Sequence, residues 1–387
     1  MKVALLGFGT VGVGVWEMLE AAPGLEQGKV LVRPGKEDAP WKTSSLEEIL
    51  ADESIGAVVE VMGGVDPAYE YAVQVLRSGK HFVTANKMLV AARAPELKAL
   101  AEEKGVAFLF SAACGGGVPF LHNMACALQG GDEIRSFGGI LNGTTNFMLD
   151  AMQRFDQDYG EALAEAQRLG YAEADPTADV SGLDALRKVL LACAVSRGKL
   201  PTEGTFCEGI ESFTAADVRA LSAQGRTCRL VGRGGESPEG ALWALVEPAL
   251  FPASASECAV LENNNLAWYR GRFSGRITLT GQGAGRYPTA SAVLRDLGGI
   301  LHGEKTMLGQ GCECIAADNA ALRSRYYVRC AVDTAAELET EKTFEAENGT
   351  ARVLTAPMAP TAIHEFAAQA RSRGEKIFYA AWEDDIC

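Results

Sequence analysis

The first 19 residues place a glycine-rich turn between a short apolar segment and an amphipathic one. Val3–Leu6 has the composition of a buried strand, and the apolar residues after it recur at helical spacing. Glycines in such a turn let the backbone bend tightly and approach a pyrophosphate, which the helix N-terminus attracts. The pattern predicts a dinucleotide site rather than a merely tight strand–helix turn. Its candidate cofactor-binding residues are Gly7, Phe8, Gly9, Thr10, Val11 and Gly12.

The rest of the first 130 residues alternates apolar segments with helical ones. Predicted strands lie in 56–64, 81–87 and 106–117, and a helix is predicted over 67–78. This alternation predicts an α/β fold with a Rossmann-type, doubly wound parallel sheet, whose ligands bind at the carboxyl ends of the strands. Lys87 follows one such end and is a candidate for the rim of an active site. The alternative is a surface lysine at the start of the next helix.

A second strand is predicted over Lys29–Arg33, and its end should lie near the adenosine ribose. NAD-binding domains usually have Asp or Glu there, about 20 residues after the glycines, to bond the 2′-hydroxyl. This sequence has Arg33, with Lys36 close behind. A cation suits a 2′-phosphate, so the sequence favours NADP over NAD. A solvated loop arginine is the alternative.

The overall composition excludes several classes of function. With 387 residues and a net charge of −14, the chain should fold into two or three domains and avoid nucleic acid and anionic membranes. No apolar run reaches the roughly 18 residues of a membrane span. Ten cysteines without regular spacing are typical of reduced thiols, so we expect a cytoplasmic protein.

The stretch GYAEADPTADVSGLDALRK (170–188) concentrates carboxylates in front of a lysine. Asp184 and Lys188 lie four residues apart, which is one helical turn. Such a pair is most often a surface salt bridge at a helix start. The alternative is a site that holds an ammonium group next to a catalytic lysine.

Five motifs together resemble the homoserine dehydrogenase family. They are GxGxxG (7–12), the pair VMGG (61–64) and TANK (84–87), ILNGTTNFML (140–149), the acid-rich stretch 170–188 and GQGAGRYPTASAVL (281–294). The motifs occur in family order and cover about residues 1 to 320. The resemblance implies NAD(P)-dependent interconversion of L-homoserine and L-aspartate 4-semialdehyde, as in threonine and methionine biosynthesis. Because the glycine motif begins at residue 7, we expect a monofunctional member without an aspartate kinase domain.

The resemblance also assigns roles to individual residues. Lys87 and Lys188 would face the reacting carbon, with Asp184 as the partner of Lys188. The substrate would be held by Gly143, Thr144, Glu173 and Asp179. Gly63, Lys87 and Gly285 would join the cofactor site.

The chemistry agrees with these assignments. Oxidising an alcohol needs a base for the hydroxyl proton while the nicotinamide takes a hydride. A lysine can serve when burial or a second cation lowers its pKa, although Asp184 would raise it. Glu173 and Asp179 could pair with the α-ammonium of homoserine.

Two departures from the family pattern concern the cofactor region. A glutamate that normally follows the strand ending at Phe110 is replaced by Ser111. In the family this neighbourhood holds a monovalent cation, Na⁺ or K⁺, whose other contacts would be the backbone carbonyls of Cys114, Gly116 and Val118. Losing the charged ligand would weaken this site. The bulky pair 286–287 also replaces small residues in a turn, where it could crowd the cofactor.

The expected architecture has three parts. Residues 1–130, with a returning helix at 288–301, form the NAD(P)-binding domain. Residues 131–287 form an α+β substrate and dimerisation domain with a mixed sheet, which would make a homodimer. Residues 320–387 resemble a shortened regulatory module of the ACT type, with the order strand, strand, helix, strand. We expect it to be degenerate, serving in packing rather than as an amino-acid sensor.

Two other functions remain open from the sequence. A related dehydrogenase could act on another amino acid, although an acceptor without an ammonium would leave Glu173 and Asp179 unpaired. A cofactor-binding regulatory protein descended from the fold is the non-enzymatic alternative, which the replacement at Ser111 keeps open.

Overall fold

The computed structural model describes residues 1–309, 311–347 and 349–384. These residues cluster into two compact units. The first consists of Met1–Arg135, Leu190–Leu200 and Ala267–Ile315, and the second consists of Ser136–Val189, Pro201–Leu266 and Ala316–Cys387. Five elements contribute residues to both units: β7 (Ile134–Ile140), α9 (Leu183–Arg197), β8 (Lys199–Glu203), β12 (Asn264–Gly271) and β14 (Glu313–Ala316).

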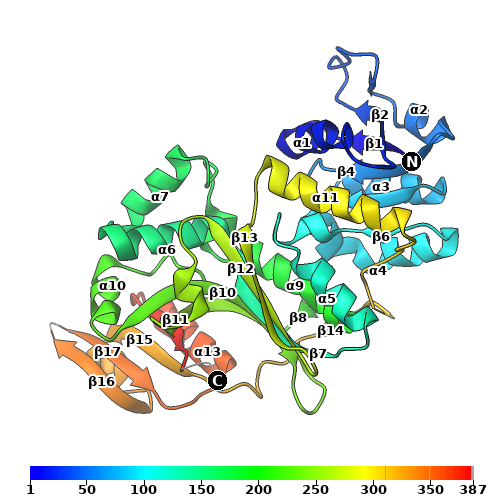
Figure 1. The fold of residues 1–387 in the computed structure, drawn as a ribbon. Coiled ribbons are helices and arrows are strands. Elements are labelled where there is room, and N and C mark those ends of the chain that lie inside the picture. The colour runs from blue at the N-terminus through cyan, green and yellow to red at the C-terminus, as the bar shows by residue number, and fades with distance from the viewer. Residues whose placement is uncertain (310, 348, 385–387) are drawn as a thin grey trace. The chain divides into compact units, whose positions relative to one another are not determined.

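The first unit contains a parallel sheet with the strand order β3-β2-β1-β4-β5-β6 (Figure 1). Every neighbouring pair in it is parallel. The strands are β1 (Lys2–Leu6), β2 (Glu26–Leu31), β3 (Lys42–Thr43), β4 (Ile55–Glu60), β5 (His81–Thr84) and β6 (Phe108–Leu109). This order reverses direction at β1, as in a doubly wound dinucleotide-binding sheet, so the predicted fold class is confirmed.

Helices cover this sheet because crossovers between parallel strands are usually helical, although the one from β2 to β3 is a loop. They are α1 (Thr10–Leu19), α2 (Leu46–Ala51), α3 (Ala68–Arg77), α4 (Lys87–Lys104), α5 (Phe120–Gln129) and α11 (Arg286–Leu301), with a 3-10 turn at Ser111–Ala113. The strand β13 (Gly275–Gln282) belongs to the same unit. The returning helix α11 packs against α1, where a Cβ on Gly14 would come within 2.7 Å of the Arg286 side chain.

The second strand differs from its predicted bounds of Lys29–Arg33. β2 ends at Leu31, opposite Leu6 at the end of β1, so Arg33 lies just past the strand. The chain then turns through Pro34, which has no N–H to donate, and Gly35, whose φ is +81°. The structure also adds β3 and α2, which the sequence did not predict.

Most strands of the second unit belong to a mixed sheet with the strand order β13-β12-β7-β10-β11-β18-β15-β17-β16, in which β9 also pairs with β11. β11 pairs in parallel with β9 and β18, whereas β10 pairs antiparallel with β7 and β11. The remaining strands are β9 (Phe206–Cys207), β10 (Arg226–Glu236), β11 (Leu242–Pro252), β15 (Arg325–Ala331), β16 (Thr340–Glu347), β17 (Thr350–Thr355) and β18 (Phe378–Trp382). The expected mixed sheet is confirmed.

The helices of this unit include the two that carry the acid-rich stretch. They are α6 (Gly143–Phe155), α7 (Tyr159–Arg168), α8 (Thr177–Val180), α9, α10 (Ala215–Ser222), α12 (Val332–Ala335) and α13 (Pro360–Ser372), with a 3-10 turn at Ser256–Ala259. α6 begins with Asn142 as its N-cap, whose side chain accepts a hydrogen bond from the Thr145 N–H. Asn is among the best N-cap residues because it satisfies an N–H that the helix leaves unpaired.

The tail has the order β15-α12-β16-β17-α13-β18. The predicted strands and long helix are present, and the structure adds β16 and the one-turn helix α12. The strand β18 pairs with β11, so the tail strands continue the sheet of the second unit. The tail therefore shares a sheet with the rest of that unit.

Among the described residues, none of the helices is long and apolar enough to cross a membrane. The same residues contain no group of three or more His, Cys, Asp or Glu side chains arranged to hold a metal ion.

Candidate functional site

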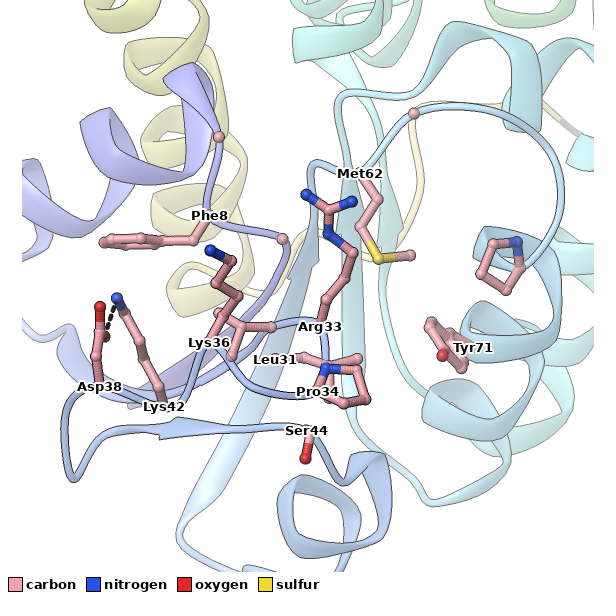
Figure 2. A pocket seen from close by; sticks show the side chains of 15 residues that line it. Phe8, Leu31, Arg33, Pro34, Lys36, Asp38, Lys42, Ser44, Met62 and Tyr71 are labelled. Atoms are coloured by element: carbon pink, nitrogen blue, oxygen red, sulfur yellow. Dashed lines mark hydrogen bonds and ion pairs between the residues drawn. The ribbon is translucent and has the colours of Figure 1, made fainter.

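A cavity of about 810 Å³ opens at the carboxyl ends of β1, β2 and β4 in the first unit (Figure 2). This volume is in the range of sites for drug-sized ligands and cofactors. The lining residues are Gly7, Phe8, Gly9, Leu31, Val32, Arg33, Pro34, Lys36, Asp38, Lys42, Ser44, Met62, Gly63, Pro67 and Tyr71. The cavity therefore lies where a doubly wound sheet binds its ligand.

Two positions of the turn beside this cavity require glycine, one for its backbone conformation and one for close packing. Gly7 has φ +101°, and a Cβ on Gly12 would stand 2.6 Å from the Gly7 carbonyl oxygen. Gly9 is the N-cap of α1 and has no side chain that could bond the first N–H groups of that helix. A Cβ there would meet nothing within 4 Å, so the helix N-terminus is open to a ligand. This cradle and the cavity fit the pyrophosphate of a dinucleotide.

Cationic side chains line the same cavity. Arg33 is exposed and extends into it from the segment after β2 (Figure 2). Lys36 and Lys42 line the cavity as well, and the Lys42 Nζ lies 2.5 Å from the Asp38 carboxylate. The Lys42 ammonium also lies 5.0 Å from the centre of the Phe8 ring. Three cations at one site suit a phosphate in addition to the pyrophosphate.

The structure divides the predicted cofactor residues into two groups. Gly7, Phe8, Gly9, Arg33 and Gly63 line the cavity. Outside its lining are Thr10, Val11 and Gly12, which form the start of α1, together with Gly285 and Lys87.

Gly285 and Lys87 each lie at the N-terminus of a helix. Gly285, with φ +114°, is the N-cap of α11. Lys87 is the first residue of α4 and follows the carboxyl end of β5, with the side chain of Asn86 accepting a hydrogen bond from the Leu89 N–H. Its position at a strand end agrees with the sequence prediction. Its side chain is half-buried.

A second candidate site lies in the second unit, around Lys188 on α9. The Lys188 Nζ donates to the Leu141 carbonyl oxygen at 2.5 Å and to an Asp184 carboxylate oxygen at 2.7 Å. Both charged side chains are 9% exposed. The pair is therefore not the solvated helix-start salt bridge that its spacing alone most often indicates, because it is buried and bonded to a third group.

Asn142 joins two carboxylates of this site. Its Nδ2 donates to Asp179 Oδ1 at 2.7 Å and to Asp184 Oδ2 at 3.0 Å. Its Oδ1 accepts from the N–H and the hydroxyl of Thr145. The sequence indicated Gly143 and Thr144 but not Asn142, although an Asn before a helical segment is an N-cap signal.

The carboxylate of Asp179 is the acceptor at the end of this network. The Thr144 hydroxyl lies 3.2 Å from Asp179 Oδ2 and 2.6 Å from the Tyr171 carbonyl oxygen, to which it donates. Burial raises the pKa of Asp179, and the nearby charge of Asp184 raises it further, while the bonds from Asn142 and Thr144 lower it. Asp179 is therefore a half-buried carboxylate next to the buried Asp184, where a cationic ligand would be stabilised.

The other acids of the stretch lie apart from this network. Glu173 is exposed, and among the hydrogen bonds of the described chain it contributes its backbone carbonyl, which accepts from Gln167. Asp175 accepts from the N–H and hydroxyl of Thr177 at the start of α8. Only Asp179 and Asp184 are thus joined to Lys188 through described hydrogen bonds.

Gly143 is needed for close packing. A Cβ at this position would stand 2.6 Å from the Asn263 carbonyl oxygen. A side chain here would displace the start of α6 and with it Asn142 and Thr144.

Replacing Asn142 should separate the capping role from the bridging role. Asn142→Ser keeps an N-cap hydroxyl but has no group that can donate to both carboxylates. We expect a melting temperature close to that of the unchanged protein and a fall of about tenfold or more in kcat, since bonds to charged groups contribute about 1.5–3 kcal/mol. Asn142→Ala should lose both the cap and the activity.

The comparison is read from thermal melting and steady-state rates. A serine variant that melts early but turns over normally would mean that Asn142 acts only as a cap.

Ser111 is hydrogen-bonded to a buried carboxylate of α11, that of Asp296. Its N–H and its hydroxyl donate to the two oxygens of Asp296 at 2.8 and 2.5 Å. Burial raises the pKa of Asp296 to about 7. The carboxylate that the sequence lacks at residue 111 is thus present beside it, on a helix that is distant in sequence. Cys114, Gly116 and Val118 follow in the next loop.

The bulky residues of the α11 turn face α1. The Tyr287 hydroxyl lies 3.0 Å from a Glu17 carboxylate oxygen, and an Arg286 nitrogen lies 3.9 Å from the other. Neither residue belongs to the lining of the cavity.

Comparisons with known proteins give two family matches. Residues 7–111 match the model described as "Homoserine dehydrogenase, NAD binding domain". Residues 119–297 match the model described as "Homoserine dehydrogenase". The two matches cover the glycine turn, the Lys87 segment and the network around Lys188.

Individual relatives agree with the family matches. The chain is 40% identical to the homoserine dehydrogenase of Corynebacterium glutamicum over 319 residues, which cover 77% of this chain and 71% of that protein. Its fold is similar to the crystal structure of a homoserine dehydrogenase from Thiobacillus denitrificans, with a TM-score of 0.87, 30% identity and coverage of 99% and 98% of the two chains. A hyperthermophilic archaeal homoserine dehydrogenase in complex with NADPH is similar with a TM-score of 0.67 and 26% identity, covering 79% of this chain and 98% of the other.

Proposed function

The chain belongs to the homoserine dehydrogenase family, and we propose on that basis that it interconverts L-homoserine and L-aspartate 4-semialdehyde with a nicotinamide cofactor. The observation that carries the proposal is the hydrogen-bonded network in which Asn142 joins the half-buried Asp179 to the buried Asp184, and in which Asp184 bonds Lys188. This network offers a proton-transferring amine and a carboxylate for an ammonium within one unit. The cofactor, when bound, supplies the hydride acceptor or donor.

Lys188 is the proposed acid and base for the reacting oxygen. In the oxidising direction its Nζ takes the hydroxyl proton, and in the reducing direction it returns one. The Leu141 carbonyl and Asp184 fix the position of this nitrogen. Burial lowers the pKa of an amine, whereas a paired carboxylate raises it, and Lys87 is the second cation that the family resemblance implies.

Asp179 is the proposed partner of the substrate ammonium. Its carboxylate is half-buried next to a second one, so an incoming cation relieves their repulsion. Thr144 and the start of α6 at Gly143 would bond the polar atoms of the substrate. Glu173 is the weaker candidate for the same role, because its side chain is exposed.

NADP is the proposed cofactor, because Arg33, Lys36 and Lys42 line the cavity where the adenosine ribose would lie. Arg33→Ala should raise the KM for NADP by about tenfold or more and leave the KM for NAD within about twofold, since only NADP has a 2′-phosphate for a charge-assisted bond. Steady-state rates with each cofactor measure the ratio. Lys29→Ala is the matched control, because Lys29 lies on β2 and pairs with Glu48 outside the lining of the cavity. Equal weakening of both cofactors in Arg33→Ala would contradict the assignment.

The activity is tested by following NADPH absorbance with both substrates. We expect NADP-dependent oxidation of L-homoserine and the reverse reduction of L-aspartate 4-semialdehyde. Absence of both reactions in the folded protein would contradict the proposal.

The same assay with added Na⁺ or K⁺ tests a monovalent cation near Cys114, Gly116 and Val118. Asp296 is the carboxylate available in that region, through its bonds to Ser111. A higher turnover rate with either ion would support a monovalent cation site in this region.

We also propose that two copies of the chain associate through the second unit. The tail would serve in packing rather than as an amino-acid sensor. Light scattering should then give about twice the chain mass of 41.0 kDa.

A further inference from the structure

Glu60 is a fully buried carboxylate at the carboxyl end of β4 in the first unit. It is 0% exposed, and neither the sequence motifs nor the proposed reaction uses it. Burying a carboxylate is unfavourable unless hydrogen bonds satisfy it. Its partners therefore indicate what this residue does.

The first carboxylate oxygen of Glu60 holds the loop after β4. Oε1 accepts from the Met62 N–H at 2.6 Å and from the Gly63 N–H at 3.2 Å. Met62 and Gly63 line the cofactor cavity, and Gly63 adopts φ +85°. Glu60 thus fixes two backbone amides in a part of the loop that borders this cavity.

The second carboxylate oxygen holds the loop after β5. Oε2 accepts from the Thr84 hydroxyl at 2.6 Å, and the same hydroxyl accepts from the Asn86 N–H at 2.9 Å. Asn86 is the N-cap of α4, and its Nδ2 donates back to the Gly64 carbonyl oxygen at 2.5 Å. The bonds form a closed circuit through two loops, and the second loop ends in Lys87.

We propose that Glu60 is a positioning residue that locks the 61–64 loop and the 84–87 loop together, so that the cofactor cavity and Lys87 keep one arrangement. The proposal rests on the proposed function, because it assumes that a dinucleotide binds in this cavity. Glu60 acts through the loops and does not itself reach the reacting atoms. The hydrogen bonds of Glu60 are buried or partly buried, so water does not replace them easily.

A carboxylate suits this position better than an amide. It accepts at both oxygens, whereas the Nε2 of a glutamine would point a donor at the Thr84 hydroxyl, whose own proton would then lose its acceptor. Glu60→Gln therefore keeps the shape and the bonds to Met62 and Gly63 but removes the charge-assisted bond from the Thr84 hydroxyl, which weakens the link to the second loop. Thr84→Val breaks the same link from the other side, and Thr84→Ser restores the hydroxyl.

Lys80 provides a matched control at the opposite ends of the same two strands. Its Nζ donates to the carbonyl oxygens of Asp52, just before β4, and of Ile55, the first residue of β4, and it is 6% exposed. Lys80→Met should lower the melting temperature without touching the two loops. It measures what a purely structural loss in this sheet does to cofactor binding.

The experiment measures the Kd for NADPH by fluorescence titration, together with kcat and melting temperature. Glu60→Gln and Thr84→Val should each raise the Kd by about tenfold, since bonds to a charged acceptor are among the strong ones. We expect kcat at saturating cofactor to fall as well, because Lys87 loses its fixed position. Thr84→Ser and Lys80→Met should keep the Kd within about twofold of the unchanged protein.

The proposal is overturned if Glu60→Gln and Thr84→Val melt earlier, as Lys80→Met does, while binding NADPH normally. It is also overturned if Thr84→Ser binds as weakly as Thr84→Val. Should Glu60→Gln fail to fold, the two threonine variants decide the outcome. Failure of the unchanged protein to bind NADPH would instead remove the proposed function itself and this inference with it.

Discussion

Lys188→Ala is expected to lower kcat by about 10²–10⁴-fold, the usual contribution of a positioned acid or base. The Kd for NADPH should stay within about twofold, because Lys188 lies in the second unit and outside the cofactor cavity. The alanine also leaves Asp184 buried without this partner, so the melting temperature has to be recorded.

Lys188→Arg distinguishes proton transfer from charge. Arginine keeps the positive charge beside Asp184 but does not give up its proton near neutral pH. Loss of turnover in both variants, in folded protein that binds NADPH, is the expected result. Full activity of Lys188→Arg would mean that Lys188 acts only through its charge.

Asp179→Asn is expected to raise the KM for L-homoserine by about 10- to 100-fold, because it removes the half-buried charge that would pair with the ammonium. The asparagine keeps the size of the side chain. The KM for NADP should hardly change, since Asp179 and the cofactor cavity belong to different units. Steady-state rates with each substrate varied in turn measure this split.

Two neighbouring acids serve as controls for Asp179. Glu173→Gln should have a smaller effect, because the Glu173 side chain is exposed. Asp175→Asn should mainly affect stability through the start of α8, where Asp175 accepts from Thr177. If Glu173→Gln raised the KM for homoserine more than Asp179→Asn, the ammonium would be held by the exposed acid.

The cofactor turn was predictable from the sequence because its signals are local. Gly7 and Gly12 approach each other within one strand–turn–helix unit, so their spacing alone carries the information. The buried pair of Asp184 and Lys188 also follows from spacing on one helix. The bond from Lys188 to the Leu141 carbonyl oxygen does not follow from this spacing, because Leu141 lies 47 residues away in the chain.

Other parts of the sites depend on contacts between distant segments. Lys42 lines the cofactor cavity from β3, a two-residue strand too short to produce a period in the sequence. Glu60 meets Thr84 only because β4 and β5 are neighbours in the sheet. Asp296 bonds Ser111 although the two residues lie 185 positions apart in the chain. The sequence pattern around Ser111 therefore did not reveal that a carboxylate lies beside it.

Some sequence signals gave the residue type but not its role. Glu173 and Asp179 looked equivalent as acids in one stretch. The fold separates them, since Asp179 is held by Asn142 and Thr144 while Glu173 is exposed. Asn142 itself resembles an ordinary helix cap until its amide is seen between two carboxylates.

The transfer of deuterium from the carbinol carbon of L-homoserine to NADP tests the central claim most directly. With L-homoserine deuterated at C4, the unchanged protein should produce NADPH that carries deuterium, detected by mass spectrometry, and Lys188→Ala should produce almost none in the same time. That result would support the proposed hydride transfer, in which Lys188 accepts the hydroxyl proton. NADPH formed without deuterium, or equal transfer by the two proteins, would contradict it.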